Sequence, residues 1–258
     1  MKSTTINRAL VVFIATAFAL GSAGCATSSS PAALAPPAAS TITAKPITWL
    51  MGTSWPVNLP LLSEAALDFA NTVTTASGGR LRIETIHPSQ HGKPAGLLQA
   101  VRRGEFDLVH TTAQYYAAEV PPIDFFTAVP FGLLPVEQEG WLNEGGGQAL
   151  FESVLAPQGI VPLTAGHTGI QMGGWFSKPL RTPQDLRGVR IRIAGFAGRV
   201  LTRVGAVPVN LPLGQIVNAF AEGKIDAADV VGPAIDSTLP RAQYAPHYLV
   251  QCARNSGT

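Results

Sequence analysis

The stretch from Gln171 to Asp236 constrains the fold most, because short apolar segments of two different periods alternate along it. Val189, Ile191 and Ile193 alternate with Arg190 and Arg192, which is the period-2 pattern of a strand with one apolar face. Two apolar sets then recur at helical spacing, each followed by a glycine placed as a stop: Phe196, Val200, Leu201 and Val204 before Gly205, and Ile216, Val217 and Phe220 before Gly223. Strands alternating with helices in this way predict an α/β fold.

A short helix is predicted just before the arginine-containing strand. Thr182 is placed to cap its start, with Pro183 at its first position and Asp185 as the partner of a capping box. Gly188 ends this helix and leads into the strand.

The preceding half of the chain shows the same alternation. Strands are predicted at residues 47–51, 81–86 and 106–110, and helices at residues 59–73, 95–103 and 148–155. A strand–helix–strand order implies a largely parallel sheet with right-handed crossovers. The glycines at 145–147 resemble a phosphate-binding loop, but no Lys-Ser/Thr pair follows, so a glycine-rich helix start is preferred. With 258 residues, the chain is long enough for two modest lobes with cores of their own.

Charge and composition exclude one large class of partner. Only 13% of residues are charged, the net charge is +2, and the 18 lysines and arginines are spread along the chain. A nucleic-acid-binding protein usually concentrates its basic residues in one patch. We therefore expect no nucleic-acid partner.

The N-terminus predicts export. Lys2 and Arg8 precede an apolar run that is too short for a membrane span and typical of a secretory signal peptide. The run ends at Ser22-Ala-Gly-Cys25, which resembles a lipobox, although Ser22 stands where a branched apolar residue is usual. Residues 26–46 are rich in Ala, Ser and Pro, as in a flexible tether. We expect residues 1–25 to act as a signal peptide and the protein to be periplasmic. Lipidation of Cys25, with the protein held to the membrane by a lipid anchor only, is preferred to the alternative of a plainly cleaved soluble protein.

Motifs of common enzymes do not occur in the sequence. There is no H-E-x-x-H, C-x-x-C, G-x-S-x-G or P-loop pattern. His87 and His91 have four-residue spacing, but Pro88 argues against a metal-binding helix through them. An exported hydrolase would need a nucleophile, and none is apparent. The sequence therefore favours a protein without catalytic activity.

Binding chemistry is better supported. Arg192 lies on the polar side of an apolar strand, close to Gly195, and a guanidinium can hold a carboxylate through two parallel hydrogen bonds. Spacing alone, however, favours the simpler interpretation that Arg190 and Arg192 both face solvent.

Other candidate binding residues also have a structural alternative. Gln171 is either a ligand or a polar residue at a strand end, and Trp175 is either a binding aromatic or a core residue. Tyr115 and Tyr116 either present hydroxyl groups to a cleft or pack in the interior. Asp229 and Asp236 are also suited to capping, with a Gly-Pro turn between them.

Taken together, these motifs resemble the substrate-binding subunit of tripartite ATP-independent periplasmic (TRAP) transporters, in the branch that binds 2-oxo acids and related small carboxylates. The resemblance covers nearly the whole chain from Ile47 to about Tyr248. It runs through Ser77–Ile83, Ala100–Asp107, the Tyr115-Tyr116 pair, Val129–Gly132 and Trp141–Gly147, and is strongest in Gln171–Phe176, Asp185–Gly195 and Ile225–Pro233.

The resemblance implies two α/β lobes that close on a ligand, and it implies roles for individual residues. Arg192 matches the strand arginine that binds the substrate carboxylate, and Trp175, Tyr115 and Tyr116 are expected beside the substrate. Gln171, Asp229 and the backbone carbonyl of Val230 match the positions that hold a bridging cation, commonly sodium, in the 2-oxoacid branch. No other cofactor is expected, and the implied partners are a small organic acid and the TRAP membrane permease subunits.

The sequence departs from the family pattern in three places. The family's Glu-Trp pair is Asp229-Val230 here, and a family acidic residue is Gln215. Family members also continue beyond the position of Thr258. The expected organisation is a first lobe at 47–170, a core of the second lobe at 171–230, and a return segment toward the first lobe at 231–258, with the second lobe incomplete. A truncated, non-functional fragment of such a receptor is the alternative to a working one.

Overall fold

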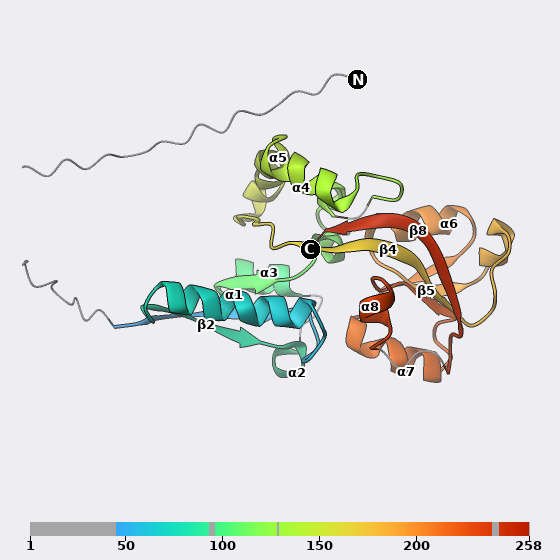
Figure 1. Ribbon diagram of the computed structural model, residues 1–258, viewed down its shortest axis with the longest axis horizontal. Helices are drawn as coiled ribbons and strands as arrows, with labels where there is room; N and C mark the ends of the chain where they lie inside the picture. Colours follow the sequence, from blue (N-terminus) through green and yellow to red (C-terminus); the bar gives the residue numbers. More distant parts are fainter. Residues whose placement is uncertain (1–44, 93–95, 128, 239–242, 258) are drawn as a thin grey trace, which may run out of the picture. The chain divides into compact units, whose positions relative to one another are not determined.

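The structure is a computed structural model that describes residues 45–92, 96–127, 129–238 and 243–257 (Figure 1). The predicted signal peptide, Cys25 and residues 26–44 of the predicted tether lie outside the described residues. Within the described part of the chain, no helix combines the length and apolar character needed to cross a membrane.

The first lobe is built on a parallel three-stranded sheet, with strand order β2-β1-β3. β1 (Ile47–Thr53) pairs in parallel with β2 (Leu81–Ile86) on one side and with β3 (Leu108–His110) on the other. The connections carry α1 (Leu62–Ala76), the single turn α2 (Pro88–His91) and α3 (Leu97–Arg102). The predicted order of strands and helices and their parallel pairing are therefore confirmed.

Helix α1 covers this sheet with small residues. Ala66 and Ala70 are buried against Met51 of β1 and Ile83 of β2. The helix begins at Leu62 rather than near residue 59 as predicted, because the backbone of Leu61 has a positive φ of 65° that a helix cannot include.

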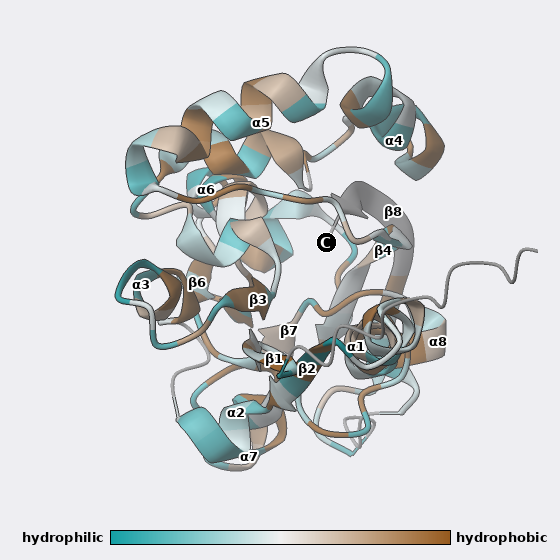
Figure 2. Cartoon of the chain, turned by 90° about the vertical axis from the view of Figure 1, so that its left-hand side faces the viewer, coloured by the Kyte–Doolittle hydropathy of each residue, from teal (hydrophilic) through white to brown (hydrophobic). Residues whose placement is uncertain are grey.

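Between the two sheets the chain forms short helices. They are the 3₁₀ segments η1 (Ala113–Tyr116), η2 (Pro121–Phe126) and η3 (Ala156–Gln158), and the helices α4 (Pro135–Asn143) and α5 (Gly147–Leu155). Phe126 and Phe151 stack with ring centroids 4.4 Å apart, which joins η2 to α5. In Figure 2 hydrophobic and hydrophilic residues mix along α5. The helix start expected around the glycines at 145–147 is confirmed, because α5 begins at Gly147. A Cβ atom on Gly147 would lie 2.8 Å from the Trp141 ring, so only glycine fits there without a shift.

The second lobe is built on a mixed five-stranded sheet, with strand order β6-β5-β7-β4-β8. β5 (Arg190–Arg192) pairs in parallel with β6 (Val207–Val209) and β7 (Ala227–Ala228). β4 (His167–Phe176) pairs antiparallel with β7 and with β8 (His247–Gly257). The helical segments of this lobe are η4 (Pro183–Leu186), α6 (Gly195–Arg203), η5 (Leu213–Gln215), α7 (Ile216–Ala221) and α8 (Pro233–Asp236).

The α/β class with two lobes is confirmed, with one local difference in a helix. The predicted helix after Thr182 is the 3₁₀ turn η4, in which the Asp185 carboxylate accepts hydrogen bonds from the backbone N–H groups of Arg181 and Thr182. β8 lies at the edge of the second sheet beside β4. The division of the chain at residues 170 and 230 stays a prediction.

One apolar cluster contains residues of both lobes. Trp55, Leu59 and Leu62 lie in the same cluster as Leu213 and Phe220 of the second lobe. A separate cluster around Phe176, Ile191 and Ala227 fills one side of the second sheet. The end of β1 is therefore packed against the α7 region, close to Val230 and Val231.

The Trp55 side chain is anchored by a histidine. Trp55 is only 1% exposed, and its indole N–H lies 2.6 Å from Nδ1 of His110 at the end of β3. An indole can only donate, so Nδ1 accepts and His110 is neutral in this arrangement. Burial lowers the pKa of His110 from its ordinary value of 6.5.

The unfolding free energy should therefore decrease as the pH falls below about 6.5. In the window between the lowered pKa of folded His110 and 6.5, the unfolded chain binds the additional proton, so acid favours unfolding. We expect His110→Gln to flatten this pH dependence by at most about 1.4 kcal/mol per pH unit, the limit for one proton. Urea denaturation between pH 5 and pH 8 measures this slope. His247→Gln replaces an exposed histidine and is the control; equal slopes in the parent protein and both variants would contradict the assignment.

Candidate functional site

The site is centred on Arg192, the last residue of β5. Ile191 next to it points into the apolar cluster with Phe176, so Arg192 points to the opposite face of the sheet. Arg192 is only 4% exposed, and three hydrogen bonds fix its guanidinium. Nε donates to the carbonyl of Leu211 (2.9 Å), Nη1 to the carbonyl of Asp229 (2.8 Å), and Nη2 to the hydroxyl of Tyr115 (3.2 Å).

This burial shows that the solvent-facing interpretation is wrong for Arg192. A guanidinium has five N–H donors, and the three bonds to described residues leave one donor on each Nη. Two neighbouring donors on a buried cation suit a carboxylate, which binds them side by side.

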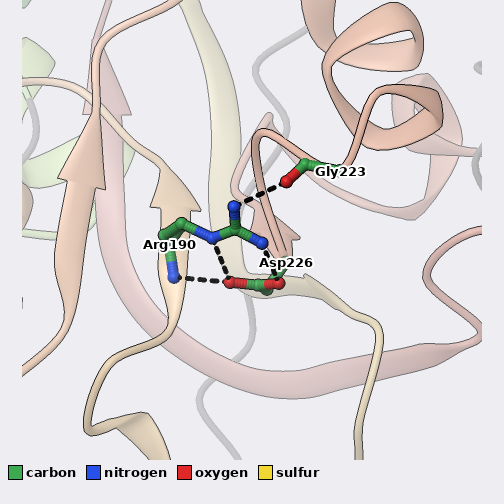
Figure 3. A network of polar contacts seen from close by, with 3 residues as sticks. All are labelled: Arg190, Gly223 and Asp226. Atoms are coloured by element: carbon green, nitrogen blue, oxygen red, sulfur yellow. Dashed lines mark hydrogen bonds and ion pairs between the residues drawn. The ribbon is translucent and has the colours of Figure 1, made fainter.

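Arg190, two residues earlier on the same face, behaves differently (Figure 3). Its side chain is 43% exposed and forms a two-pronged ion pair with Asp226: Nε lies 2.8 Å from Oδ2 and Nη2 lies 2.7 Å from Oδ1. Nη1 also donates to the carbonyl of Gly223 (2.5 Å). The hydrogen bonds from Arg190 hold the pKa of Asp226 below its ordinary value. Arg190 is thus occupied within the protein, and the sequence alone did not reveal Asp226 as its partner.

Gln171 in β4 carries a buried side-chain amide whose N–H group is hydrogen-bonded and whose oxygen has no hydrogen-bond partner among the described residues. The side chain is 2% exposed, and its Nε2 donates to the carbonyl of Val230 (2.8 Å). Its Oε1 has no hydrogen-bond partner among the described residues. A buried acceptor left in this state costs about 1–3 kcal/mol, so a ligand or ion that binds this oxygen would be favoured.

Asp229 and Val230 follow directly after β7. The Asp229 N–H donates to the carbonyl of Arg192 (2.9 Å), which continues the pairing of β5 with β7, and the Asp229 side chain is 4% exposed. The backbone of β4 comes very close here: a Cβ atom on Gly174 would lie 2.6 Å from the carbonyl oxygen of Ala228. The glycines after Gln171 therefore allow β4 to bring its side chains beside Asp229.

Trp175 is positioned by Asp236 and Tyr248. The Trp175 indole N–H donates to Oδ2 of Asp236 (3.1 Å), and the Tyr248 ring centroid is 4.3 Å from that of Trp175. Oδ1 of Asp236 accepts a hydrogen bond from the backbone N–H of Val231 (3.1 Å). Trp175 packs against the apolar cluster that contains Val230, so it lies next to the candidate site.

The two neighbouring tyrosines, Tyr115 and Tyr116, lie in different environments. Tyr115 reaches Arg192, as described above. Tyr116 is 2% exposed in the first lobe, its hydroxyl lies 3.1 Å from Oγ1 of Thr111, and it lines a cavity of about 280 Å³ with Leu98, Phe126 and Phe151. Burial raises its pKa to about 12. The structure thus does not place Tyr116 with the other candidate residues.

The cluster contains oxygen donors suited to a hard cation. The Gln171 amide oxygen, the Asp229 carboxylate and the Val230 carbonyl are the type of ligands that sodium and calcium prefer. The Oε1 of Gln171, which has no hydrogen-bond partner among the described residues, is chemically suited to bind such an ion. A metal centre built from His, Cys, Asp and Glu alone does not fit, because no group of three or more of these residues occurs among the described residues. A site based on His87 and His91 is therefore not supported.

Comparisons with known proteins identify relatives of this chain. The chain is 37% identical over 202 residues to a monocarboxylate 2-oxoacid-binding periplasmic protein of Nostoc sp., covering 78% of this chain and 55% of that protein. Two crystal structures of TRAP periplasmic solute-binding proteins each have a TM-score of 0.79 and 34% identity, and the alignments cover 83% of this chain and 65% of theirs. The one from Pseudoalteromonas atlantica has sodium and pyruvate bound, and the one from Colwellia psychrerythraea has calcium and pyruvate bound.

The chain therefore spans just over half of the Nostoc protein (55%) and 65% of the two solved structures. The model of one protein family, described as bacterial extracellular solute-binding protein, family 7, matches residues 51–250. This match confirms the family predicted from the motifs. The chain is a member of the family 7 bacterial extracellular solute-binding proteins.

Proposed function

We propose that this protein captures a small carboxylate, such as a 2-oxo acid, outside the cytoplasm and delivers it chemically unchanged to TRAP membrane permease subunits. The buried Arg192, with one donor left on each Nη, is the observation that carries this proposal. The signal peptide at 1–25, the lipid anchor at Cys25 and the periplasmic location are parts of the same proposal.

Each residue of the site has a distinct role in this proposal. Arg192 binds the carboxylate, while the carbonyls of Leu211 and Asp229 hold its guanidinium in place. Gln171, Asp229 and Val230 hold a sodium or calcium ion, which would neutralise ligand charge and bind ligand oxygens. Because Val230 stands where the family has Trp, the wall at this position is aliphatic. Trp175, fixed by Asp236, supplies an aromatic surface instead.

Binding is expected to shift the two lobes toward a closed arrangement. Tyr115 belongs to η1 of the first lobe and contacts Arg192 of the second lobe. A ligand held by Arg192 would therefore contact both lobes at once. Capture at micromolar concentration requires about −8 kcal/mol, and a desolvated Arg–carboxylate pair together with the cation could supply much of it.

A melting-temperature screen tests the proposal. Pyruvate and other 2-oxo acids should raise the melting temperature of the parent protein, and omitting sodium and calcium should reduce that rise. Gln171→Ala should remove most of the cation effect, because it deletes the unsatisfied Oε1. Gln184→Ala, in the exposed turn η4, is the matched control. If the folded protein melts at the same temperature with every acid and cation tested, the proposal is wrong.

A further inference from the structure

The contact between the two lobes continues beyond the ligand site, from η2 to α6. Asp124 of η2 is 2% exposed, and its Oδ2 lies 2.8 Å from Nη2 of Arg199 in α6. The Arg199 side chain is 50% exposed, so a buried carboxylate is paired with a guanidinium at the protein surface.

The surroundings of this ion pair are closely packed. A Cβ atom on Gly195, the first residue of α6, would lie 2.9 Å from Oδ1 of Asp124. The Phe125 and Phe196 rings lie 6.2 Å apart, and Cζ of Arg199 lies 5.0 Å from the centre of the Phe196 ring. The start of α6 therefore fits directly against η2.

This contact is linked to the ligand site through short segments on both sides. Gly195 follows Arg192 by three residues, and Tyr115 lies in η1, which neighbours η2 in the first lobe. Separating the lobes would break the Arg192–Tyr115 and Arg199–Asp124 contacts together. Because a buried carboxylate is costly to remove from water, the Arg199 side chain offsets part of the cost of covering Asp124 when the lobes are closed.

We propose that Asp124 and Arg199 form a latch that keeps the lobes closed and so sets how slowly a bound ligand leaves. The latch rests on the proposed function, since it acts on a captured carboxylate. Asp124 and Arg199 are positioning residues in this role: they act on the lobes and not on the ligand. Breaking the pair should raise the dissociation rate and should not lower the association rate, because ligand enters and leaves through the open form.

Stopped-flow tryptophan fluorescence with pyruvate and sodium measures both rates. We expect Asp124→Asn and Arg199→Gln each to raise the dissociation rate about tenfold, which corresponds to about 1.4 kcal/mol. The double variant should lie close to the single variants, because each removes the same interaction. Arg203→Gln removes an exposed cation from the last turn of the same helix and should have no effect.

The latch would be overturned if the two substitutions changed the dissociation rate additively in the double variant. It would also be overturned if the dissociation rates of the variants stayed at the parent value. Small-angle scattering of the ligand-free variants distinguishes a failure of the latch from a failure of the proposed ligand binding. If the parent protein binds no acid, Asp124→Asn should still increase the radius of gyration relative to the parent. An unchanged radius in that case would reject the latch independently.

Discussion

Arg192→Gln should abolish the stabilisation of this protein by 2-oxo acids. The substitution removes the guanidinium, which donates to the carbonyls of Leu211 and Asp229, and leaves a shorter, neutral polar side chain. Loss of one partner from a buried, hydrogen-bonded charge pair costs about 2–5 kcal/mol, which lowers the affinity between roughly 30-fold and several-thousand-fold. Isothermal titration calorimetry with pyruvate and sodium measures the loss directly.

Arg190→Gln is the matched control for this experiment. It removes the same charge from the same face of β5, two residues away, but Arg190 is already paired with Asp226. We expect ligand affinity to change by less than about twofold and the stability to decrease only slightly, since the pair is partly exposed. Equal losses of affinity in the two variants would show that Arg192 does not bind the ligand.

Gly174→Ala should strongly destabilise the fold. Gly174 has a φ of 103°, where a residue with a side chain is strained, and its added Cβ would lie 2.6 Å from the carbonyl oxygen of Ala228. The contact is with backbone at the β4–β7 pairing, so neither strand can yield without losing its hydrogen bonds. Strain and overpacking together should cost about 3 kcal/mol or more. Urea denaturation followed by far-ultraviolet circular dichroism measures this loss.

Gly169→Ala separates the two causes. Gly169 lies in the same strand with a φ of 82°, but no atom given by the described part of the chain lies within 4 Å of its added Cβ. This variant should lose only the conformational part, about 1–2 kcal/mol. If Gly174→Ala is no less stable than Gly169→Ala, the close approach of β4 to β7 does not restrict side-chain size at this position.

The elements with strong local signals were predictable from the sequence. β2 was predicted at the residues where it occurs, and the alternation around Arg192 gave the position of β5 within about two residues. The start of α1 was missed because the positive φ of Leu61 has no signal in its residue type. The pairing of β8 with β4 depends on residues about eighty positions apart, and local periodicity carries no information about it.

The roles of the site residues stay a prediction, and only the positions of the candidate residues can be compared with the structure. The residue types identified Arg192, Gln171 and Asp229 as candidates, and the structure places them around the ends of β5 and β7. Spacing could not distinguish Arg192 from Arg190, because both lie on one face of a strand. The difference arises from the residues opposite: the carbonyl of Leu211 covers Arg192, whereas Asp226 meets Arg190 near the surface. Tyr115 and Tyr116 both lie in the 3₁₀ turn η1, where adjacent side chains point in different directions, so their environments differ.

The cluster that contains Trp55, Leu59 and Leu62 together with Leu213 and Phe220 determines how the lobes can move. These side chains belong to both lobes, so neither lobe can rotate independently without exposing apolar surface to water. Opening should therefore be a hinge motion, in which the lobes separate at the edge away from this cluster while the cluster itself stays buried. The joint beside Trp55, against which Tyr115 also packs, would act as the hinge.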